Sequence, residues 1–162
     1  MTDSQYHIEF KVNGRNVFGA DTGSLSLFQG ANLIVASSGF SGGRSSPAAS
    51  EPIPSATYHI MLSIRNTVTN YPTLGDTEDA MHQWYGIEKI DETGWQFEWG
   101  HFRAHLNEPN QNMAQGYRGN FLHGKLRPHD YTHGCICERS ETILNKLWLL
   151  PRNLRIPVKV TR

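Results

Sequence analysis

Cysteine and long apolar runs are both scarce in this sequence. Its 162 residues include only 2 cysteines, too few for a disulfide framework. No apolar stretch approaches the roughly 20 residues that span a bilayer, so membrane insertion is not expected. Residues 1–15 contain no basic segment and no apolar core, so they do not resemble a cleavable secretory signal. These absences predict a protein that is made in a reducing cytosol.

An excess of charge of one sign is also lacking. The 15 basic and 15 acidic side chains cancel to a formal net charge of +0. Proteins that attract nucleic acid or anionic membranes over long range carry a basic excess, so neither partner is expected. With 38% hydrophobic and 10% aromatic residues, the chain can fill a core. Its length fits a single domain over residues 1–162.

Most of the chain alternates short β-prone stretches with turns. Alternating apolar side chains predict a strand at Tyr6–Val12. Asn13-Gly14 then predicts a hairpin, because a type I′ turn needs positive φ at both central positions. Val17-Phe18 would begin the returning strand. A second hairpin is predicted from the β-prone stretches 25–28 and 33–36.

The middle of the chain is predicted to be less regular. Residues 37–54 are rich in glycine, serine and proline without a period, which predicts a long loop. Residues 67–83 are polar and turn-rich, with room for a short helix at 78–84. The remaining predicted strands are 58–64, 85–90, 95–106, 117–122 and 156–160.

One segment has clear helical spacing, at residues 140–150. Its apolar residues recur on one helical face, Ser140 fits an N-cap, and Pro151 would end the helix. The sequence therefore predicts a mainly β domain with one or two helices.

Cysteine, histidine and glycine concentrate in residues 121–140. Cys135 lies in Thr132-His133-Gly134-Cys135-Ile136, ahead of the predicted helix. The thiolate is the nucleophilic form of cysteine, and a helix N-terminus or an imidazolium lowers the thiol pKa. We therefore expect a low thiol pKa at Cys135. Gly134 permits a tight backbone path beside a substrate carbonyl. The alternative is a buried structural thiol.

His123-Gly124 precedes this cysteine in the sequence. A cysteine nucleophile needs a base within hydrogen-bond reach and a group that orients the base. His123 ends a strand-like run, and a hairpin would bring it beside Cys135. A histidine at an exposed strand end is the alternative.

Zinc binding is a further alternative. The nitrogen and sulfur donors nearby are His123, His129, His133, Cys135 and Cys137. One residue between two cysteines is shorter than the spacing of usual zinc knuckles and seldom permits a disulfide. Cys137 is therefore expected to be a small packed side chain. His101 and His105 are expected on a solvated strand face.

These motifs resemble a known family signature. His123-Gly124 followed by 132–136 is similar to the L,D-transpeptidase (YkuD-type) catalytic domain, which has His-Gly, a spacer, then Ser/Thr-His-Gly-Cys and an aliphatic residue. Further segments resemble the small subfamily used as type VI secretion effectors: Gly39–Gly42, Glu51–Pro54, Tyr58–Ile60 and Arg118. The resemblance covers about residues 6–150 and is densest at 117–139. The spacer is shorter than in housekeeping members. Cys137 stands where many relatives carry Arg or Asn, with Arg139 displaced by two positions.

The resemblance implies an L,D-transpeptidase-like β-sandwich or barrel and acyl transfer on bacterial peptidoglycan without a cofactor or metal. Cys135 would attack the carbonyl at the L-centre of meso-diaminopimelate in a tetrapeptide stem and release D-alanine. His123 would move the proton, oriented by the Gly124 carbonyl. Residues implied at the oxyanion or the substrate are Tyr117, Arg118, Thr132, His133, Gly134 and Arg139, with the Cys135 amide. Water as acceptor gives an L,D-carboxypeptidase; a D-amino acid or second stem gives exchange or cross-linking.

Together with this resemblance, the lack of a secretory signal in residues 1–15 predicts a different route of export. An enzyme injected by a type VI secretion apparatus into the periplasm of a target bacterium needs no such signal. The expectation is therefore an antibacterial effector that is inert in the producer's cytosol. Its partners would be peptidoglycan stem peptides, the secretion apparatus and a cognate immunity protein.

Three other functions remain open from the sequence. NlpC/P60-type and papain-like cysteine peptidases use related chemistry, but their cysteine precedes their histidine, whereas His123 comes first here. A zinc-binding interaction module is the non-enzymatic alternative. A sugar- or wall-binding β-domain is the third, suggested by four tryptophans that core packing explains equally well. These are Trp84, Trp95, Trp99 and Trp148.

Overall fold

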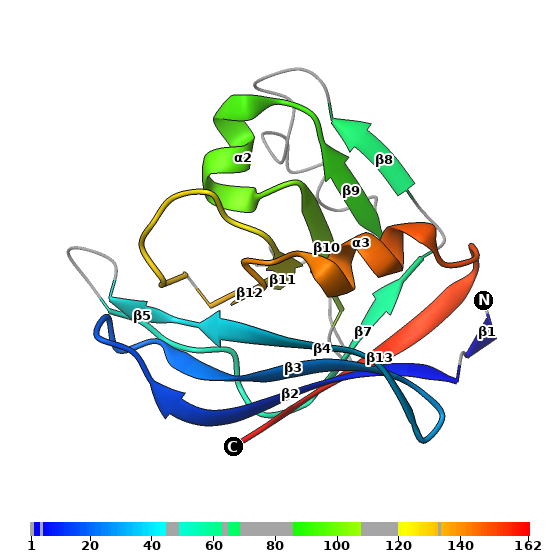
Figure 1. Cartoon of the computed structure of the whole chain (residues 1–162), viewed down its shortest axis with the longest axis horizontal. Coiled ribbons are helices and arrows are strands. Elements are labelled where there is room, and N and C mark those ends of the chain that lie inside the picture. Colours follow the sequence, from blue (N-terminus) through cyan, green and yellow to red (C-terminus); the bar gives the residue numbers. More distant parts are fainter. Residues whose placement is uncertain are drawn as a thin grey trace, which may run out of the picture.

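The computed structural model describes residues 2–3, 5–44, 49–62, 65–68, 86–107, 120–132 and 134–162, and it shows a mainly β fold with two helices (Figure 1). The strands are β1 (Thr2–Asp3), β2 (Tyr6–Arg15), β3 (Asp21–Gln29), β4 (Asn32–Ser41), β5 (Gly43–Arg44), β6 (Ala49–Ser50), β7 (Thr57–Met61), β8 (Arg65–Val68), β9 (Ile87–Ile90), β10 (Phe102–Leu106), β11 (Asn120–His123), β12 (Ile136–Cys137) and β13 (Leu154–Thr161). The helices are α2 (Thr93–Trp99) and α3 (Thr142–Leu149). The predicted fold class is confirmed.

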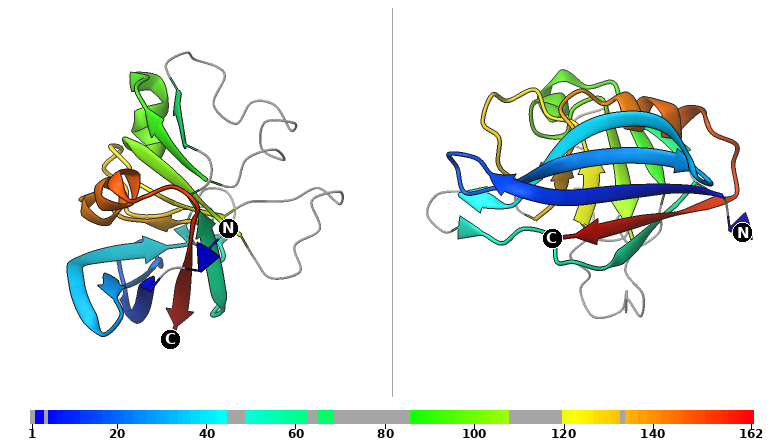
Figure 2. Two further views of the ribbon diagram at one scale, coloured as in Figure 1. Left: turned by 90° about the vertical axis from the view of Figure 1, so that its right-hand side faces the viewer. Right: turned by 60° about the horizontal axis from the view of Figure 1, so that its bottom comes forward.

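One 11-stranded sheet contains most of these strands and curves into a barrel-like shape (Figure 2). The hairpins β2–β3–β4 form one side, and β12 joins β4 to β11, β10 and β9. Strand β7 pairs with β13, and a bridge between His59 and Asn107 returns β7 to the end of β10. The sheet therefore nearly closes on itself, which protects most of its edges.

The apolar core lies inside this curved sheet and beneath α3. The residues that form it include Ile8, Phe10, Leu25, Leu27, Ile60, Ala104, Leu122, Ile136, Leu144 and Val158. From α3, Ile143, Leu144 and Leu147 are buried, as their helical spacing predicts. Burying one such side chain fully contributes about 1.5–3 kcal/mol, so this core is the main source of stability.

The hairpin turn predicted at Asn13-Gly14 is wrong. Strand β2 continues through these two residues, with a bulge in its pairing to β3. The chain reverses after Asn16 instead, where the side-chain oxygen of Asn16 accepts two amides of the turn at 2.9 and 3.1 Å. Gly19 supplies the positive φ, at 79°. Val17-Phe18 therefore belong to the turn, because a side-chain hydrogen bond there outweighs the Asn-Gly signal.

The long strand predicted at 95–106 is half helix. The Glu92 carboxylate accepts the amide of Trp95 at 3.0 Å and caps α2. Gly100, with φ of 67°, ends the helix before β10 begins. Local capping therefore outweighs the β preference of the aromatic residues in this segment.

Other predictions hold in part. The pair 25–28 and 33–36 lies within β3 and β4, and the strands predicted at 58–64, 85–90 and 156–160 correspond to β7, β9 and β13. The loop predicted at 37–54 is interrupted, since β4 reaches Ser41 and β5 and β6 follow. The helix option at 78–84 lies outside the described residues.

Helix α3 begins later than predicted, and Ser140 is not its cap. The residue before its first turn is Glu141, in the left-handed region with φ of 56°. The first amides of α3, from Ile143 and Leu144, donate to the carboxylate of Glu138 at 3.0 Å each. Leu150 and then Pro151 end the helix as expected.

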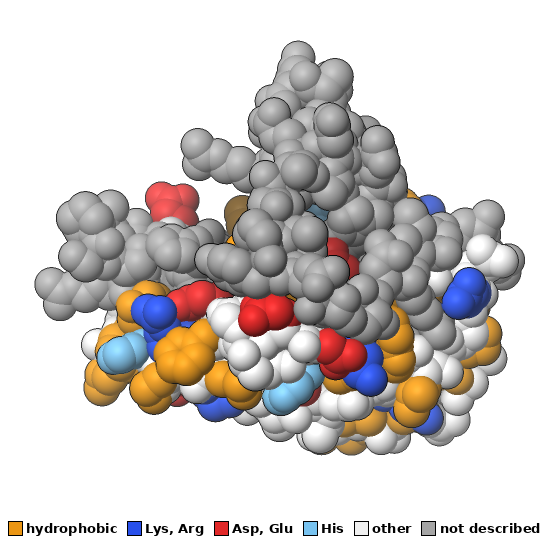
Figure 3. Space-filling model, turned by 90° about the horizontal axis from the view of Figure 1, so that it is seen from above, with side chains coloured by type: hydrophobic (Ala, Val, Ile, Leu, Met, Phe, Trp, Pro, Cys, Tyr) orange, Lys and Arg blue, Asp and Glu red, His pale blue; other side chains and the backbone are white. Residues whose placement is uncertain are grey.

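The described surface mixes both charge signs. In Figure 3, basic side chains lie among acidic ones on the visible face, which fits the neutral net charge. Neither described helix is long and apolar enough to cross a membrane.

Candidate active site

Strands β10, β11 and β12 have one apolar face and one polar face, although both are buried. Side chains alternate between the faces of a strand, so Phe102, Ala104, Leu122 and Ile136 enter the core. The opposite face carries six side chains that we call the polar layer. They are Glu88, Arg103, His105, Phe121, His123 and Cys135. Register places Arg103 opposite His123 and His105 opposite Phe121.

His123 is oriented through one ring nitrogen. Its side chain is buried, and Nδ1 contacts the carbonyl oxygen of Gly124. Because a carbonyl only accepts, Nδ1 carries the hydrogen and Nε2 keeps the lone pair of a base. The ring of Trp99 meets the imidazole edge to face, with centroids 4.9 Å apart. The contact between Gly124 and the imidazole that the resemblance implies is present; its role in catalysis stays a prediction.

Cys135 belongs to a small buried cluster that also involves the aromatic rings of Phe121 and Trp99. Its side chain forms a buried cluster with Phe121, against which Trp99 packs, and Sγ accepts the amide hydrogen of Phe121 at 3.4 Å. Parallel pairing of β11 with β12 sets His123 opposite Cys137. Cys135 is two residues before Cys137, which brings it beside Phe121, two residues before His123. Among the described residues, no hydrogen bond joins Sγ to His123. Such bonds often tighten only when substrate is bound.

Burial determines the protonation states of this pair. It raises the pKa of the Cys135 thiol to about 11, opposed by the Phe121 amide, Arg103 and Lys125. Burial also lowers the pKa of His123 to about 4; the bond to Gly124 opposes this fall, while Lys125 and Arg103 reinforce it. Both groups are therefore neutral near pH 7.

The low thiol pKa expected from the sequence is accordingly wrong for this state. That expectation relied on a helix N-terminus and an imidazolium beside Cys135, but burial keeps the His123 imidazole neutral. The first amides of α3 are instead bound by the Glu138 carboxylate, and burial dominates the electrostatics of the thiol.

Thr132 holds the loop that carries the cysteine. Its hydroxyl donates to the Cys135 carbonyl at 2.7 Å and accepts the amides of Gly42 and Gly134 at 2.9 and 3.2 Å. A hydroxyl has one hydrogen and two lone pairs, so the substrate contact predicted for Thr132 has no remaining partner site. The Gly134 amide is engaged too. The Cys135 amide has no partner among the described residues and remains the candidate oxyanion donor.

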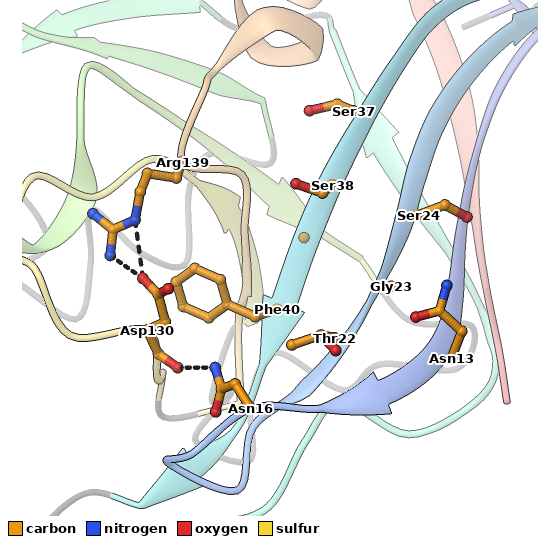
Figure 4. A pocket seen from close by; sticks show the side chains of 11 residues that line it. Asn13, Asn16, Thr22, Gly23, Ser24, Ser37, Ser38, Phe40, Asp130 and Arg139 are labelled. Atoms are coloured by element: carbon orange, nitrogen blue, oxygen red, sulfur yellow. Dashed lines mark hydrogen bonds and ion pairs between the residues drawn. The ribbon is translucent and has the colours of Figure 1, made fainter.

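Arg139 is committed to contacts within the protein. Its Nε donates to Asp130 at 3.0 Å (Figure 4). Its Nη1 donates to the Lys125 carbonyl at 3.0 Å. The positive charge of Arg139, which a substrate carboxylate would need, is thus already paired with the Asp130 carboxylate. The substrate role suggested for Arg139 stays a prediction that this geometry does not favour. Tyr117, Arg118 and His133 lie outside the described residues.

A cavity of about 530 Å³ adjoins Arg139 and Asp130. Hydroxyl and amide side chains from β2, β3 and β4 line it, among them Asn13, Thr22, Ser24 and Ser38 (Figure 4). Phe40 also lines it and packs against Cys137. Cys137 is fully buried and neither cysteine is in a disulfide, as expected. The polar cavity therefore lies beside the strand that follows Cys135.

No family model matches this chain, and no curated protein does either. What the site can do follows from its own geometry. A buried thiol and an imidazole with a free Nε2 lone pair on neighbouring strand segments suit nucleophilic catalysis with a general base. No group of three His, Cys, Asp or Glu residues able to hold a metal occurs in the described part of the chain.

Sequence reasoning missed the charged part of the polar layer. Arg103 and Glu88 are each 2% exposed, and Nη2 of Arg103 donates to Oε1 of Glu88 at 3.0 Å. His105 was expected to be solvated but is 1% exposed and stacks on Phe121. The signal was present in β10, where Arg103 and His105 alternate with apolar residues. The alternation of polar and apolar residues predicts one solvent-exposed face of this strand, because no local sequence feature shows that Trp99, at the end of α2, packs over that face.

The structure also describes His101 and two of the tryptophans named in the sequence analysis. His101 precedes β10, and its Nδ1 pairs with Glu141 at 2.7 Å. Trp99 packs within the candidate site and Trp148 packs against the core. Trp84 lies outside the described residues.

Proposed function

We propose that the protein is a cysteine-dependent acyl-transfer enzyme with Cys135 as nucleophile and His123 as general base. The observation that carries the proposal is the contact of His123 Nδ1 with the Gly124 carbonyl, which leaves Nε2 as the basic nitrogen. Trp99 packs against the imidazole and against the buried cluster of Phe121 and Cys135, so the two groups share one water-poor layer.

The neutral pair determines the sequence of proton transfers. As Sγ bonds to the substrate carbonyl carbon, its proton moves to Nε2 of His123, and the carbonyl electron pair moves onto oxygen. The Cys135 amide would stabilise that oxyanion. When the tetrahedral intermediate collapses, the carbon–nitrogen bond breaks and the leaving amine takes the proton from His123. Water or an amine then attacks the thioester with the same base and restores the thiol.

The proposed substrate is the tetrapeptide stem of peptidoglycan. The similarity of His123-Gly124 and 132–136 to the L,D-transpeptidase signature supports this choice. The adjacent cavity, lined by hydroxyl and amide groups, suits a polar polymer better than an apolar ligand. Release of terminal D-alanine would accompany either hydrolysis or exchange.

The direct test is digestion of purified tetrapeptide muropeptides. We expect wild type to release D-alanine, and Cys135→Ala and His123→Ala to lose about 10³-fold or more of that rate. Cys137→Ala is the matched control and should keep activity within about threefold, because Cys137 is a packed neighbour. Turnover that survives Cys135→Ala would refute the nucleophile.

Delivery is a separate part of the proposal and rests on the effector-like resemblance. An antibacterial effector should be toxic to Escherichia coli when fused to a periplasmic export signal and harmless without it. Cys135→Ala should abolish that toxicity, and co-expression of the cognate immunity protein should suppress it. Equal toxicity from both forms, or none from either, would contradict delivery to the periplasm as the site of action.

A further inference from the structure

A buried ion pair crosses the polar layer beside the candidate nucleophile. Register aligns Glu88 on β9, Arg103 on β10 and His123 on β11 in one row across the sheet. Nη2 of Arg103 lies 3.0 Å from Oε1 of Glu88, and both side chains are almost wholly buried. Removing such charges from water costs more than their attraction usually returns, and apolar replacements are often more stable. Stability alone therefore does not explain why this pair is here.

Arg103 is also held between two aromatic rings. Its Cζ lies 4.6 Å from the ring centroid of Trp99 and 4.4 Å from that of Phe121. A guanidinium stacked on two ring faces is restricted in orientation. Phe121 and Cys135 form one buried cluster against which Trp99 packs, and the Phe121 amide is the donor to Sγ.

The charge of Arg103 reaches the thiol as well. Burial raises the pKa of Cys135, and Arg103 is among the groups that oppose this rise. The other groups around the thiol are His123 on β11, Lys125 on the following loop, and His105, which stacks on Phe121 from β10. Lys125 is engaged elsewhere, because its Nζ donates to the Tyr131 carbonyl at 2.6 Å.

We infer that Arg103 is a positioning residue for Cys135: it fixes the Phe121 and Trp99 rings that hold the thiol and supplies the positive charge that faces the thiolate as it forms. Glu88 orients this guanidinium and moderates its charge. The inference deepens the proposed function and rests on it for its catalytic meaning, but the effect on the thiol can be measured without any substrate.

The test is the pH dependence of Cys135 alkylation by iodoacetamide, resolved from Cys137 by tandem mass spectrometry. We expect Arg103→Met to raise the apparent thiol pKa by about one unit, which slows alkylation about tenfold at fixed pH. Arg103→Lys should keep the thiol pKa and the alkylation rate close to those of wild type, because it retains the positive charge. Glu88→Gln should change the pKa in the opposite direction, since it removes the carboxylate that moderates the arginine charge.

The chain contains a matched control. Arg127 pairs with Glu98 at 2.7 Å and lies over Phe97 with Cζ 5.6 Å from the ring centroid, but it is outside the polar layer and half exposed. Arg127→Met removes the same kind of contact and should leave the Cys135 profile unchanged. An equal shift in Arg127→Met, or no shift in a folded Arg103→Met, would overturn the inference.

Folding is checked by circular dichroism and thermal melting. If Arg103→Met does not fold, Glu88→Gln decides: a lowered thiol pKa supports the inference, and an unchanged or raised one overturns it. D-alanine release is measured on the same variants. Shifted alkylation without D-alanine release by wild type would refute the proposed substrate and leave the role of Arg103 intact.

Discussion

The two faces of β10 and β11 are equally buried but differ in chemistry. On one face, Ala104 and Leu122 pack within the barrel core. On the other, Arg103 and His123 lie opposite each other beneath Trp99. Burial of the first face stabilises the fold through apolar contact. Burial of the second costs free energy and instead changes pKa values and fixes side-chain orientation.

Substitutions on each face should separate these two uses most strongly. Leu122→Ala should lower the free energy of unfolding by about 2–5 kcal/mol, because it leaves a cavity in the core. The double variant Glu88→Leu/Arg103→Met should leave stability unchanged or increase it, since it removes both charges of the buried pair. Urea unfolding monitored by circular dichroism measures both proteins. A larger loss of stability in the double variant than in Leu122→Ala would reverse the comparison.

Acid should destabilise the polar face through His123. The pKa of His123 is about 4 in the folded protein and about 6.5 when unfolded. As pH falls below about 6.5 the unfolded chain binds a proton that the folded chain excludes, so stability decreases until about pH 4. Between pH 7 and pH 5 the loss from this group is about 2 kcal/mol.

His123→Gln isolates that contribution. Its unfolding free energy should depend less on pH over the same interval, with the other histidines and carboxyl groups common to both proteins. Denaturant unfolding at pH 7 and pH 5 gives the difference. Identical pH dependence in wild type and His123→Gln would mean that the imidazole is not buried in its neutral form.

The loop that bears Cys135 should depend on one hydroxyl for its stability. Thr132→Val removes the hydroxyl that donates to the Cys135 carbonyl and accepts two amides. Leaving buried groups without partners should cost about 1–3 kcal/mol of stability. Thr142→Val, at the exposed start of α3, is the control and should cost less. Equal thermal shifts in the two variants would contradict the role given to Thr132.

The smallest effect is expected at the exposed counterpart of the buried pair. Arg127→Met removes a half-exposed contact with Glu98, and such surface pairs contribute about 0–1 kcal/mol. We expect its melting temperature to stay close to that of wild type. A loss comparable to that of Leu122→Ala would show that exposure is a poor guide to these interactions.

Local patterns predicted the elements whose signals are strong and short in range. Apolar spacing identified α3, alternation identified β2, and short β-prone stretches identified parts of β3 and β13. The failures came where a side chain competed with the pattern. Asn16 moved the first turn, Glu92 converted the start of a predicted strand into α2, and Glu138 took the amides of α3 that were expected to act on Cys135.

The sequence by itself determined the mainly β class, the helix after Cys135, and Cys135 and His123-Gly124 as candidate site residues, because those conclusions need only composition, spacing and motif order. Tertiary structure alone decided that Arg103, Glu88 and His105 are buried beside them, that Thr132 is used within its loop, and that the thiol and imidazole are both neutral. Each of these depends on which strands pair and what covers them. Burial and distance, unlike spacing, are properties of the whole fold.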